Sequence, residues 1–154
     1  MNGCSRRFDQ SGLEILSAAE CHKLLGSVRV GRLLFTSAAL PTVRLVNFVV
    51  DADTIVFATA DADRYRAAER GDVVAFEVDD IALDEHGGWT VTAVGHLSVV
   101  DADEFEDLQQ TLPRRPWPPD RERYLIRLGI ESLDGRRLVA WAQRHEDPQQ
   151  EELH

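Results

Sequence analysis

The stretch from Pro41 to Arg66 constrains the fold more than any other part of the sequence. Residues 43–50 and 55–59 are mostly apolar or β-branched, which is typical of β-strands. Residues 51–53, Asp-Ala-Asp, lie between them and favour a turn. The stretch therefore predicts a β-hairpin, followed by a loop that brings Arg64 to one rim of the sheet, where its guanidinium can hold an anion.

Other segments add strands and short helices, and their ends carry residues that cap or break such elements. Ser17 and Glu20 match a capping box, which predicts a helix that ends at Gly26. The pair Asp134-Gly135 is a signal for a hairpin turn between two last strands. The whole pattern predicts a mainly β fold, an antiparallel barrel of six to seven strands decorated by two or three short helices. The predicted strands are 30–36, 43–50, 55–59, 73–78, 89–100, 124–130 and 136–142, and the other predicted helices are 64–70 and 101–112.

The chain of 154 residues is long enough for one domain with its own core. We expect this domain at residues 13–144, between disordered tails at residues 1–12 and 145–154. The two cysteines, Cys4 and Cys21, fit a reducing cytoplasm better than a disulfide framework. The sequence has neither a signal-peptide pattern nor a run of about 20 apolar residues, which favours a cytoplasmic protein without a membrane span.

Charge and residue spacing exclude several classes of function. The formal net charge of −10 opposes nucleic-acid binding, because that binding depends on clustered Lys and Arg side chains against phosphates. The histidines lack the spacing of metal ligands, so no metal site is expected, and His96 is interpreted as a hydrogen-bonded structural residue. No pair of nucleophile and base is recognisable in the sequence.

Polar residues of the central hairpin and its neighbours form a candidate anion site. Arg44 lies on the first strand, Thr59 ends the second, and Arg64 follows five residues later at a predicted helix start. Backbone N–H groups at a helix start favour an anion. A phosphate there would let an attached flat apolar group lie along the strand edges, although Arg44 could instead pair with a surface carboxylate. The candidate residues are Arg44, Asn47, Thr59, Arg64, Tyr65 and Thr90.

Several short motifs between Leu24 and Leu138 reinforce this interpretation by their order. They are VGRLLF at 30–35, R-x-V at 44–46, F-x-T at 57–59, the basic residue at 64, G-W-T-V-x-x-x-G at 88–95, P-W at 116–117 and G-R-R at 135–137. No single motif is specific. Their order and spacing resemble those of the FMN-binding split β-barrels of the pyridoxamine 5'-phosphate oxidase-like superfamily, above all its short actinobacterial members.

The resemblance implies a homodimer that holds FMN between its subunits. It places the strand at residues 44–47 beside the isoalloxazine ring, residues 58–59 near the ribityl chain, Arg64 on the phosphate and Thr90 near the ring. It also implies that Arg136, Arg137 or Trp141 approaches the partner's flavin. The implied cofactor-binding residues are Arg44, Leu45, Val46, Asn47, Ala58, Thr59, Arg64, Tyr65 and Thr90.

The sequence departs from the oxidase pattern at two places. Tyr65 follows Arg64 where the oxidase has a second basic residue at the phosphate, and the C-terminal R-x-H-D-R motif that grips the vitamin substrate is absent. We therefore expect an FMN-dependent oxidoreductase for a small planar substrate, and not a pyridoxamine phosphate oxidase. Two alternatives stay open: a relative that uses a deazaflavin or haem in the same barrel, and a non-catalytic module that carries or senses flavin.

Overall fold

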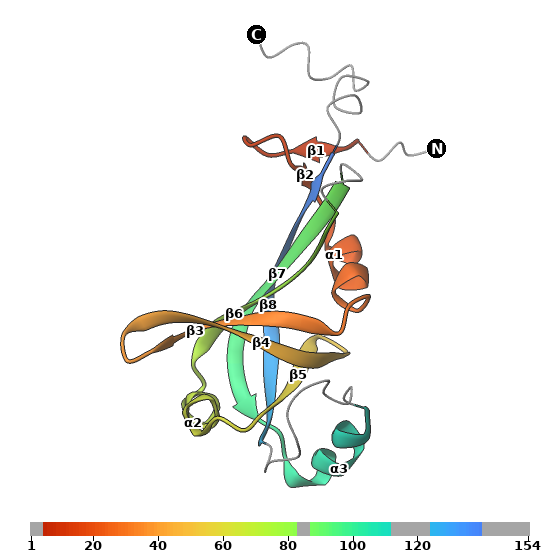
Figure 1. The fold of residues 1–154 in the computed structure, drawn as a ribbon. Coiled ribbons are helices and arrows are strands. Elements are labelled where there is room, and N and C mark those ends of the chain that lie inside the picture. Colours follow the sequence, from red (N-terminus) through yellow and green to blue (C-terminus); the bar gives the residue numbers. More distant parts are fainter. Residues whose placement is uncertain (1–4, 83–86, 112–123, 140–154) are drawn as a thin grey trace.

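The computed structural model describes residues 5–82, 87–111 and 124–139 of the chain. Within these residues it has eight β-strands and three α-helices (Figure 1). The strands are β1 (Arg7–Phe8), β2 (Glu14–Ile15), β3 (Val30–Ser37), β4 (Leu40–Asp51), β5 (Thr54–Thr59), β6 (Val73–Ala82), β7 (Gly87–Val99) and β8 (Tyr124–Leu138), and the helices are α1 (Ala18–Leu25), α2 (Ala62–Arg70) and α3 (Ala102–Thr111).

The strands form one antiparallel sheet that closes on itself. Its order is β1-β2-β8-β5-β4-β3-β6-β7, and a further pairing between β7 and β8 joins the longer strands into a ring. The two shortest strands, β1 and β2, extend the sheet from β8. In Figure 1 the β3–β4 hairpin projects to the left above α2, and α1 and α3 lie on the right. The structure confirms the predicted mainly β, antiparallel barrel with short helices.

The last described strand is longer than the sequence predicts. β8 runs without a turn through Asp134 and Gly135, so the predicted hairpin at this pair is wrong. Gly135 instead lies opposite Val91 within the β7–β8 ladder. A Cβ atom at Gly135 would lie 2.6 Å from Sγ of Cys21 and 3.1 Å from Cδ1 of Leu16. The glycine therefore allows α1 and the segment before it to lie close to β8, and strand pairing overrides the local turn signal.

The amino-terminal segment is ordered from an earlier point than predicted. Arg7–Phe8 pairs with Glu14–Ile15, which pairs in turn with β8. Between these strands, Asp9 accepts a hydrogen bond from the N–H of Leu13 at 3.0 Å, and this contact lowers the pKa of the Asp9 carboxyl. The prediction of a disordered tail is corrected for residues 7–12. Residues 1–4 and the predicted tail at 145–154 lie outside the described residues.

Helix α1 forms as its capping signals predict. The Ser17 hydroxyl accepts a hydrogen bond from the N–H of Glu20 at 3.2 Å, and Gly26 follows the last helical residue. This side-chain acceptor satisfies one of the N–H groups that the first helical turn leaves without a partner. Cys21 and Leu25 lie on the buried side of the helix and join the barrel core.

Aromatic side chains fill the centre of the barrel. Phe48, Phe57 and Phe76 are at most 2% exposed, and the rings of Phe48 and Phe76 meet edge to face with centroids 4.8 Å apart. Gly31 makes room for one of them, because a Cβ atom there would overlap with Cζ of Phe76. Gly31 therefore lets a core side chain lie directly against the backbone of β3. A smaller apolar cluster on the outer side of β5 and β8 is covered by α3.

The contacts at Gly135 generate a stability prediction. We expect Gly135→Ala to lower the free energy of unfolding by about 1–3 kcal/mol, because the added methyl group overpacks against Cys21 and Leu16. Urea denaturation followed by circular dichroism measures this change. Gly129→Ala is the matched control on the same strand, since its Cβ atom would meet no atom nearer than the His96 carbonyl oxygen at 4.0 Å. Equal losses in the two variants would contradict the packing role of Gly135.

Candidate functional site

The site lies where β4 and β5 separate. Their ladder begins at the turn after Asp51 and ends with Phe48 opposite Phe57. Before this point, β4 pairs with β3, and beyond it β5 continues beside β8 as far as Thr59 opposite Tyr124. The two strands therefore diverge and turn their edges toward an opening in the barrel wall. This opening is the split that the resemblance implied.

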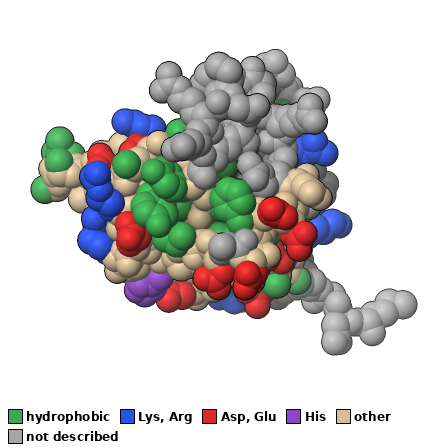
Figure 2. Space-filling view, turned by 90° about the horizontal axis from the view of Figure 1, so that it is seen from below, with side chains coloured by type: hydrophobic (Ala, Val, Ile, Leu, Met, Phe, Trp, Pro, Cys, Tyr) green, Lys and Arg blue, Asp and Glu red, His purple; other side chains and the backbone are tan. Residues whose placement is uncertain are grey.

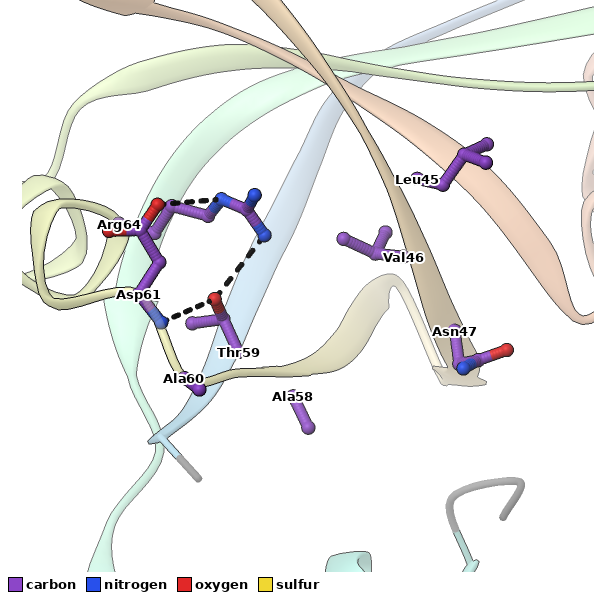
Figure 3. A pocket seen from close by; sticks show the side chains of 8 residues that line it. All are labelled: Leu45, Val46, Asn47, Ala58, Thr59, Ala60, Asp61 and Arg64. Atoms are coloured by element: carbon purple, nitrogen blue, oxygen red, sulfur yellow. Dashed lines mark hydrogen bonds and ion pairs between the residues drawn. The ribbon is translucent and has the colours of Figure 1, made fainter. Parts of the chain in front are cut away.

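A hollow of about 230 Å³ occupies this opening, and we call it the split pocket. Figure 3 shows Val46 pointing across it toward Arg64, while Leu45 and Asn47 point away from Arg64, as alternation along a strand requires. Their strand edge nevertheless borders the hollow. The pocket is lined by Leu45, Val46, Asn47, Ala58, Thr59, Ala60, Asp61 and Arg64.

Thr59, Asp61 and Arg64 are held together at the start of α2. The N–H of Asp61 donates to the Thr59 hydroxyl at 3.1 Å, and the Asp61 carboxylate caps the helix by accepting from the N–H of Asp63 at 2.9 Å. Nη1 of Arg64 also donates to the Thr59 hydroxyl, at 3.3 Å. Because the cap fixes the first helical turn, it also fixes the direction in which Arg64 leaves the helix. α2 thus begins at Ala62, two residues before the predicted start at Arg64, and its last residue is Arg70, before Gly71, as predicted.

Arg64 is the main positive charge of the split pocket. Its side chain is only 12% exposed, its Nε lies 3.6 Å from Oδ2 of Asp61, and its guanidinium carbon lies 5.5 Å from the centre of the Phe35 ring. Little solvent surrounds this charge, so its attraction for an anion is screened less than at the surface. The start of α2 adds N–H groups and the positive end of the helix dipole. The Asp61 carboxylate opposes an incoming anion.

Charge is unevenly distributed on the surface near the site. Figure 2 views the molecule from below and shows hydrophobic side chains gathered near the centre of this face, with basic side chains along its left side. Acidic side chains lie mainly on its lower and right parts. The left side is where the β3–β4 hairpin and α2 lie in Figure 1. The formal charge of the whole chain is −10, yet basic side chains gather along this left side.

The structure brings most of the predicted site residues together around one hollow. Arg44 is not among the lining residues, although alternation along β4 places it on the same face as Val46. Its side chain is exposed, and Nη1 donates to the Val43 carbonyl oxygen at 2.9 Å. The predicted residues that line the pocket are Leu45, Val46, Asn47, Ala58, Thr59 and Arg64.

Tyr65 and Thr90 lie apart from the hollow. The ring of Tyr65 stacks on that of Tyr124, with centroids 4.4 Å apart, so this side chain ties α2 to β8. Thr90 lies on β7, opposite Asp79 on one side and Arg136 on the other. Within one chain, the roles that the resemblance implied for Tyr65 and Thr90 stay predictions. Of the C-terminal residues expected near a partner's flavin, Trp141 lies outside the described residues.

Two lining residues, Ala60 and Asp61, were not predicted for the site. Ala60 contributes through its position between β5 and α2, a role that no side-chain pattern reveals. Asp61 had a usable signal, because an aspartate before a run of helix-forming residues is a frequent N-cap. The predicted helix begins at Arg64 and therefore leaves this N-cap outside it.

Arg32, Glu77 and Asp79 form a charged cluster on the outer face of the sheet. Nη1 of Arg32 donates to Oε2 of Glu77 at 3.0 Å and to Oδ2 of Asp79 at 2.7 Å. Partial burial raises the pKa of the Glu77 carboxyl, and its hydrogen bond with Asp79 raises that pKa further. The hydrogen bond to Glu77 and the negative charge of Asp79 raise the pKa of Arg32. The positive charge of Arg32 thus offsets part of the negative charge of the two carboxylates on this face.

Across residues 5–82, 87–111 and 124–139, no helix has the length and apolar character needed to cross a membrane. In the same residues, no group of three or more His, Cys, Asp or Glu side chains is placed to hold a metal ion.

Known proteins share this fold and sequence pattern. The Mycobacterium tuberculosis protein Rv0080, itself uncharacterised, is 34% identical over 146 residues, which cover 90% of this chain and 95% of that protein. A Corynebacterium glutamicum protein provisionally assigned as a pyridoxamine 5'-phosphate oxidase superposes with a TM-score of 0.71 at 26% identity, covering 83% of this chain and 99% of the other. The FAD binding protein from Mycobacterium smegmatis gives a TM-score of 0.64 at 29% identity, covering 82% and 98%.

A family model gives the same result for most of the chain. The model described as pyridoxamine 5'-phosphate oxidase matches residues 17–137, from the cap of α1 to the end of β8. The matched segment contains the whole ring of strands and every residue that lines the split pocket. The chain therefore belongs to the pyridoxamine 5'-phosphate oxidase family.

Proposed function

We propose that the chain binds FMN in the split pocket and transfers electrons or hydride between this flavin and a small planar substrate. One observation carries the proposal: the pocket joins a phosphate-sized positive corner, made by Arg64, Thr59 and the start of α2, to an open strand edge at Leu45–Asn47. A ligand with a phosphate at one end and a flat ring at the other matches this arrangement. The name of the M. smegmatis relative supports a flavin as the class of cofactor.

At the phosphate end, Arg64 would supply the charge and Thr59 a hydroxyl. The two side chains already lie together, because Nη1 of Arg64 donates a hydrogen bond to the Thr59 hydroxyl oxygen. The N–H of Asp61, just before α2, donates to the same oxygen. A phosphate would accept hydrogen bonds from the guanidinium and from N–H groups of the first turn of α2. These contacts would replace the longer contact between Arg64 and Asp61.

At the ring end, the edge of β4 offers main-chain N–H and C=O groups. The β5 partner is absent along this part of β4, so these groups are available to the polar edge of a flat ligand. A bound flavin supplies the redox chemistry, while the protein binds it, orients it and sets the charge around its ring. Arg44, on the same face as Val46, is the residue that we expect to tune the charge at that edge.

A second copy of the chain would complete the pocket. The split pocket has a volume of about 230 Å³, which lies below the range of about 300–1,000 Å³ usual for small-molecule sites. One side of a flavin bound to a single chain would therefore stay open. Leu45 lines this open side and is 58% exposed. A homodimer with the flavin between its subunits would cover both the ligand and this side chain.

The outer face of the barrel offers a surface for such a dimer. Val43, Leu34, Ala75 and Val94 lie opposite one another on four adjacent strands and form an apolar row, which we call the barrel-face row. Val43 is 51% exposed and Leu34 is 38% exposed. Contiguous exposed apolar residues of this kind are typical of protein interfaces. The Arg32–Glu77–Asp79 cluster beside the row is already internally paired, which lowers the cost of covering it.

The absorbance spectrum of the purified protein tests the proposed cofactor. The protein is measured as isolated, and again after mixing with FMN and desalting. Retained flavin bands at about one per subunit support the proposal and lead to a screen of electron donors. A single violet band would identify a deazaflavin and a sharp Soret band haem, the alternatives left by the sequence. Flavin binding without reduction by NADH, NADPH or a reduced deazaflavin would favour the carrier or sensor alternative.

The cytoplasmic location stays a prediction.

Arg64→Ala tests the phosphate contact. We expect the variant to bind FMN about tenfold or more weakly, because a charge-assisted hydrogen bond to the phosphate is lost. Titration of flavin fluorescence measures the dissociation constant. Lys23→Ala, which removes a positive charge from the exposed side of α1, is the control and should bind FMN like the original protein. Unchanged FMN affinity in Arg64→Ala would show that the phosphate lies elsewhere.

Asp61→Asn tests the opposing charge. Asparagine caps a helix as well as aspartate does, so α2 should keep its first turn while the negative charge beside Arg64 is removed. We expect FMN to bind about two- to fivefold more tightly, the range for a partly exposed pair of charges. The same titration measures the effect, and riboflavin, which has no phosphate, is the control ligand. An equal gain for both ligands would contradict the placement of the phosphate.

Val43→Asp tests the dimer surface without changing a lining residue. A buried unpaired carboxylate should weaken the association of the subunits, and FMN retention should fall with it. Light scattering coupled to gel filtration measures the mass of the particle. Leu40→Asp, at the exposed tip of the β3–β4 hairpin and outside the barrel-face row, is the matched control. A dimer that survives in Val43→Asp as it does in Leu40→Asp would rule out this face.

A further inference from the structure

Phe35 lies at the border between the barrel core and α2. It shares the inner face of β3 with Gly31 and Leu33, as alternation along a strand requires. The β3–β6 ladder ends one residue before it, with Leu34 opposite Ala75. Its side chain packs against the core but is only partly buried. The ring is therefore available for contacts with side chains of α2.

The Phe35 ring contacts the flat face of the Arg64 guanidinium. The guanidinium carbon lies over the ring, 5.5 Å from its centre, which is within the range of about 6 Å for a cation–π contact. The Arg64 side chain is only 12% exposed, so solvent weakens this attraction little. All N–H donors of a guanidinium lie in its plane. Phe35 therefore orients Arg64 without occupying a donor that an anion needs.

The other two partners of Arg64 behave differently. Nη1 of Arg64 donates to the Thr59 hydroxyl at 3.3 Å, and Nε lies 3.6 Å from Oδ2 of Asp61. A phosphate in the split pocket would take the place of Asp61 beside the guanidinium. Phe35 carries no charge and does not compete with that phosphate, so its contact can persist through the exchange. An arginine already held in place loses less rotamer freedom when the anion binds.

We propose that Phe35 is a positioning residue of the split pocket, which keeps the guanidinium of Arg64 directed at the flavin phosphate when this phosphate displaces Asp61. The inference rests on the proposed function and deepens it. Phe35 is not among the residues that line the split pocket, so it acts only through Arg64. Its effect is therefore confined to ligands that carry the phosphate.

Phe35→Leu tests this role, because leucine keeps an apolar side chain on the inner face of β3 but removes the ring. We expect FMN to bind about three- to tenfold more weakly, the range for one long side chain that is no longer held in place. Riboflavin, which has no phosphate, should bind as tightly as before. Titration of flavin fluorescence with the full chain, freed of bound flavin, measures both dissociation constants.

Two further variants separate the ring from the fold. Phe35→Tyr keeps an aromatic ring at this position and should bind FMN like the original protein. Phe8→Leu makes the same replacement on β1, opposite Glu14, and is the matched control that should leave both affinities unchanged. Phe35→Met, whose flexible side chain can fill the space of the ring, takes the place of Phe35→Leu if that variant does not fold, with the same expected result.

A double-mutant cycle tests whether Phe35 acts through Arg64. In the Arg64→Ala background, Phe35→Leu should cause no further loss of FMN affinity, because the side chain that Phe35 positions is then missing. A ring that supports the pocket only by packing would instead weaken FMN and riboflavin binding alike, with or without Arg64.

The outcomes distinguish this role from the proposed function. Unchanged FMN affinity in Phe35→Leu, an equal loss for FMN and riboflavin, or a further loss in the Arg64→Ala background would overturn the role of Phe35 and leave the FMN proposal intact. If the original protein binds FMN no more tightly than riboflavin, or if Arg64→Ala leaves FMN affinity unchanged, the phosphate lies elsewhere, and its placement at Arg64 and the role of Phe35 fail together.

Discussion

The structure depends on the point at which β4 stops pairing with β5. A regular small barrel keeps every strand edge paired and fills its interior with side chains, so it leaves little space for a ligand. Here β4 has a long amino-terminal part that follows β3, while β5 stays with β8. The wall must therefore open where these two directions diverge. The apolar core closes the barrel below the opening, where Phe48 and Phe57 lie opposite each other.

The same opening couples the stability of α2 to the charge of the site. The carboxylate of Asp61 begins the helix and also faces the guanidinium of Arg64. A negative charge at a helix start stabilises the helix through its dipole. An anionic ligand at this place would take over part of that favourable interaction and would also compete with Asp61 for Arg64. The Asp61 cap and a bound anion would therefore compete for the same N–H groups and for the same arginine.

Helix α2 also relates the different surfaces of the molecule to one another. Arg64 faces the split pocket, Tyr65 contacts β8, and Arg66 with Arg70 faces the end of β3. A helix turns by about 100° per residue, so side chains close together in the sequence of α2 can contact three different parts of the barrel. The exposed barrel-face row lies on the outer side of the strands whose inner side holds the core. A partner on that face would come up to the edge of the split pocket at Leu45.

The sequence by itself determined the local parts of this protein. Alternating apolar residues and Asp-Ala-Asp at 51–53 determine the central hairpin, Ser17 and Gly71 determine helix ends, and the spacing from Thr59 to Arg64 determines that these two side chains meet. Each of these features depends on neighbours within a few residues, where propensity, capping and side-chain reach act directly.

Only the tertiary structure decided which strands pair, and therefore which residues share a site. Asp134-Gly135 carries a turn signal, but pairing with β7 and the close contact with Cys21 keep β8 straight through it. Thr90 fits a ligand motif in sequence, yet the register of β7 places it beside Asp79 and Arg136, apart from the pocket. Register and edge pairing are set by contacts between residues far apart in the chain, and no local pattern encodes them.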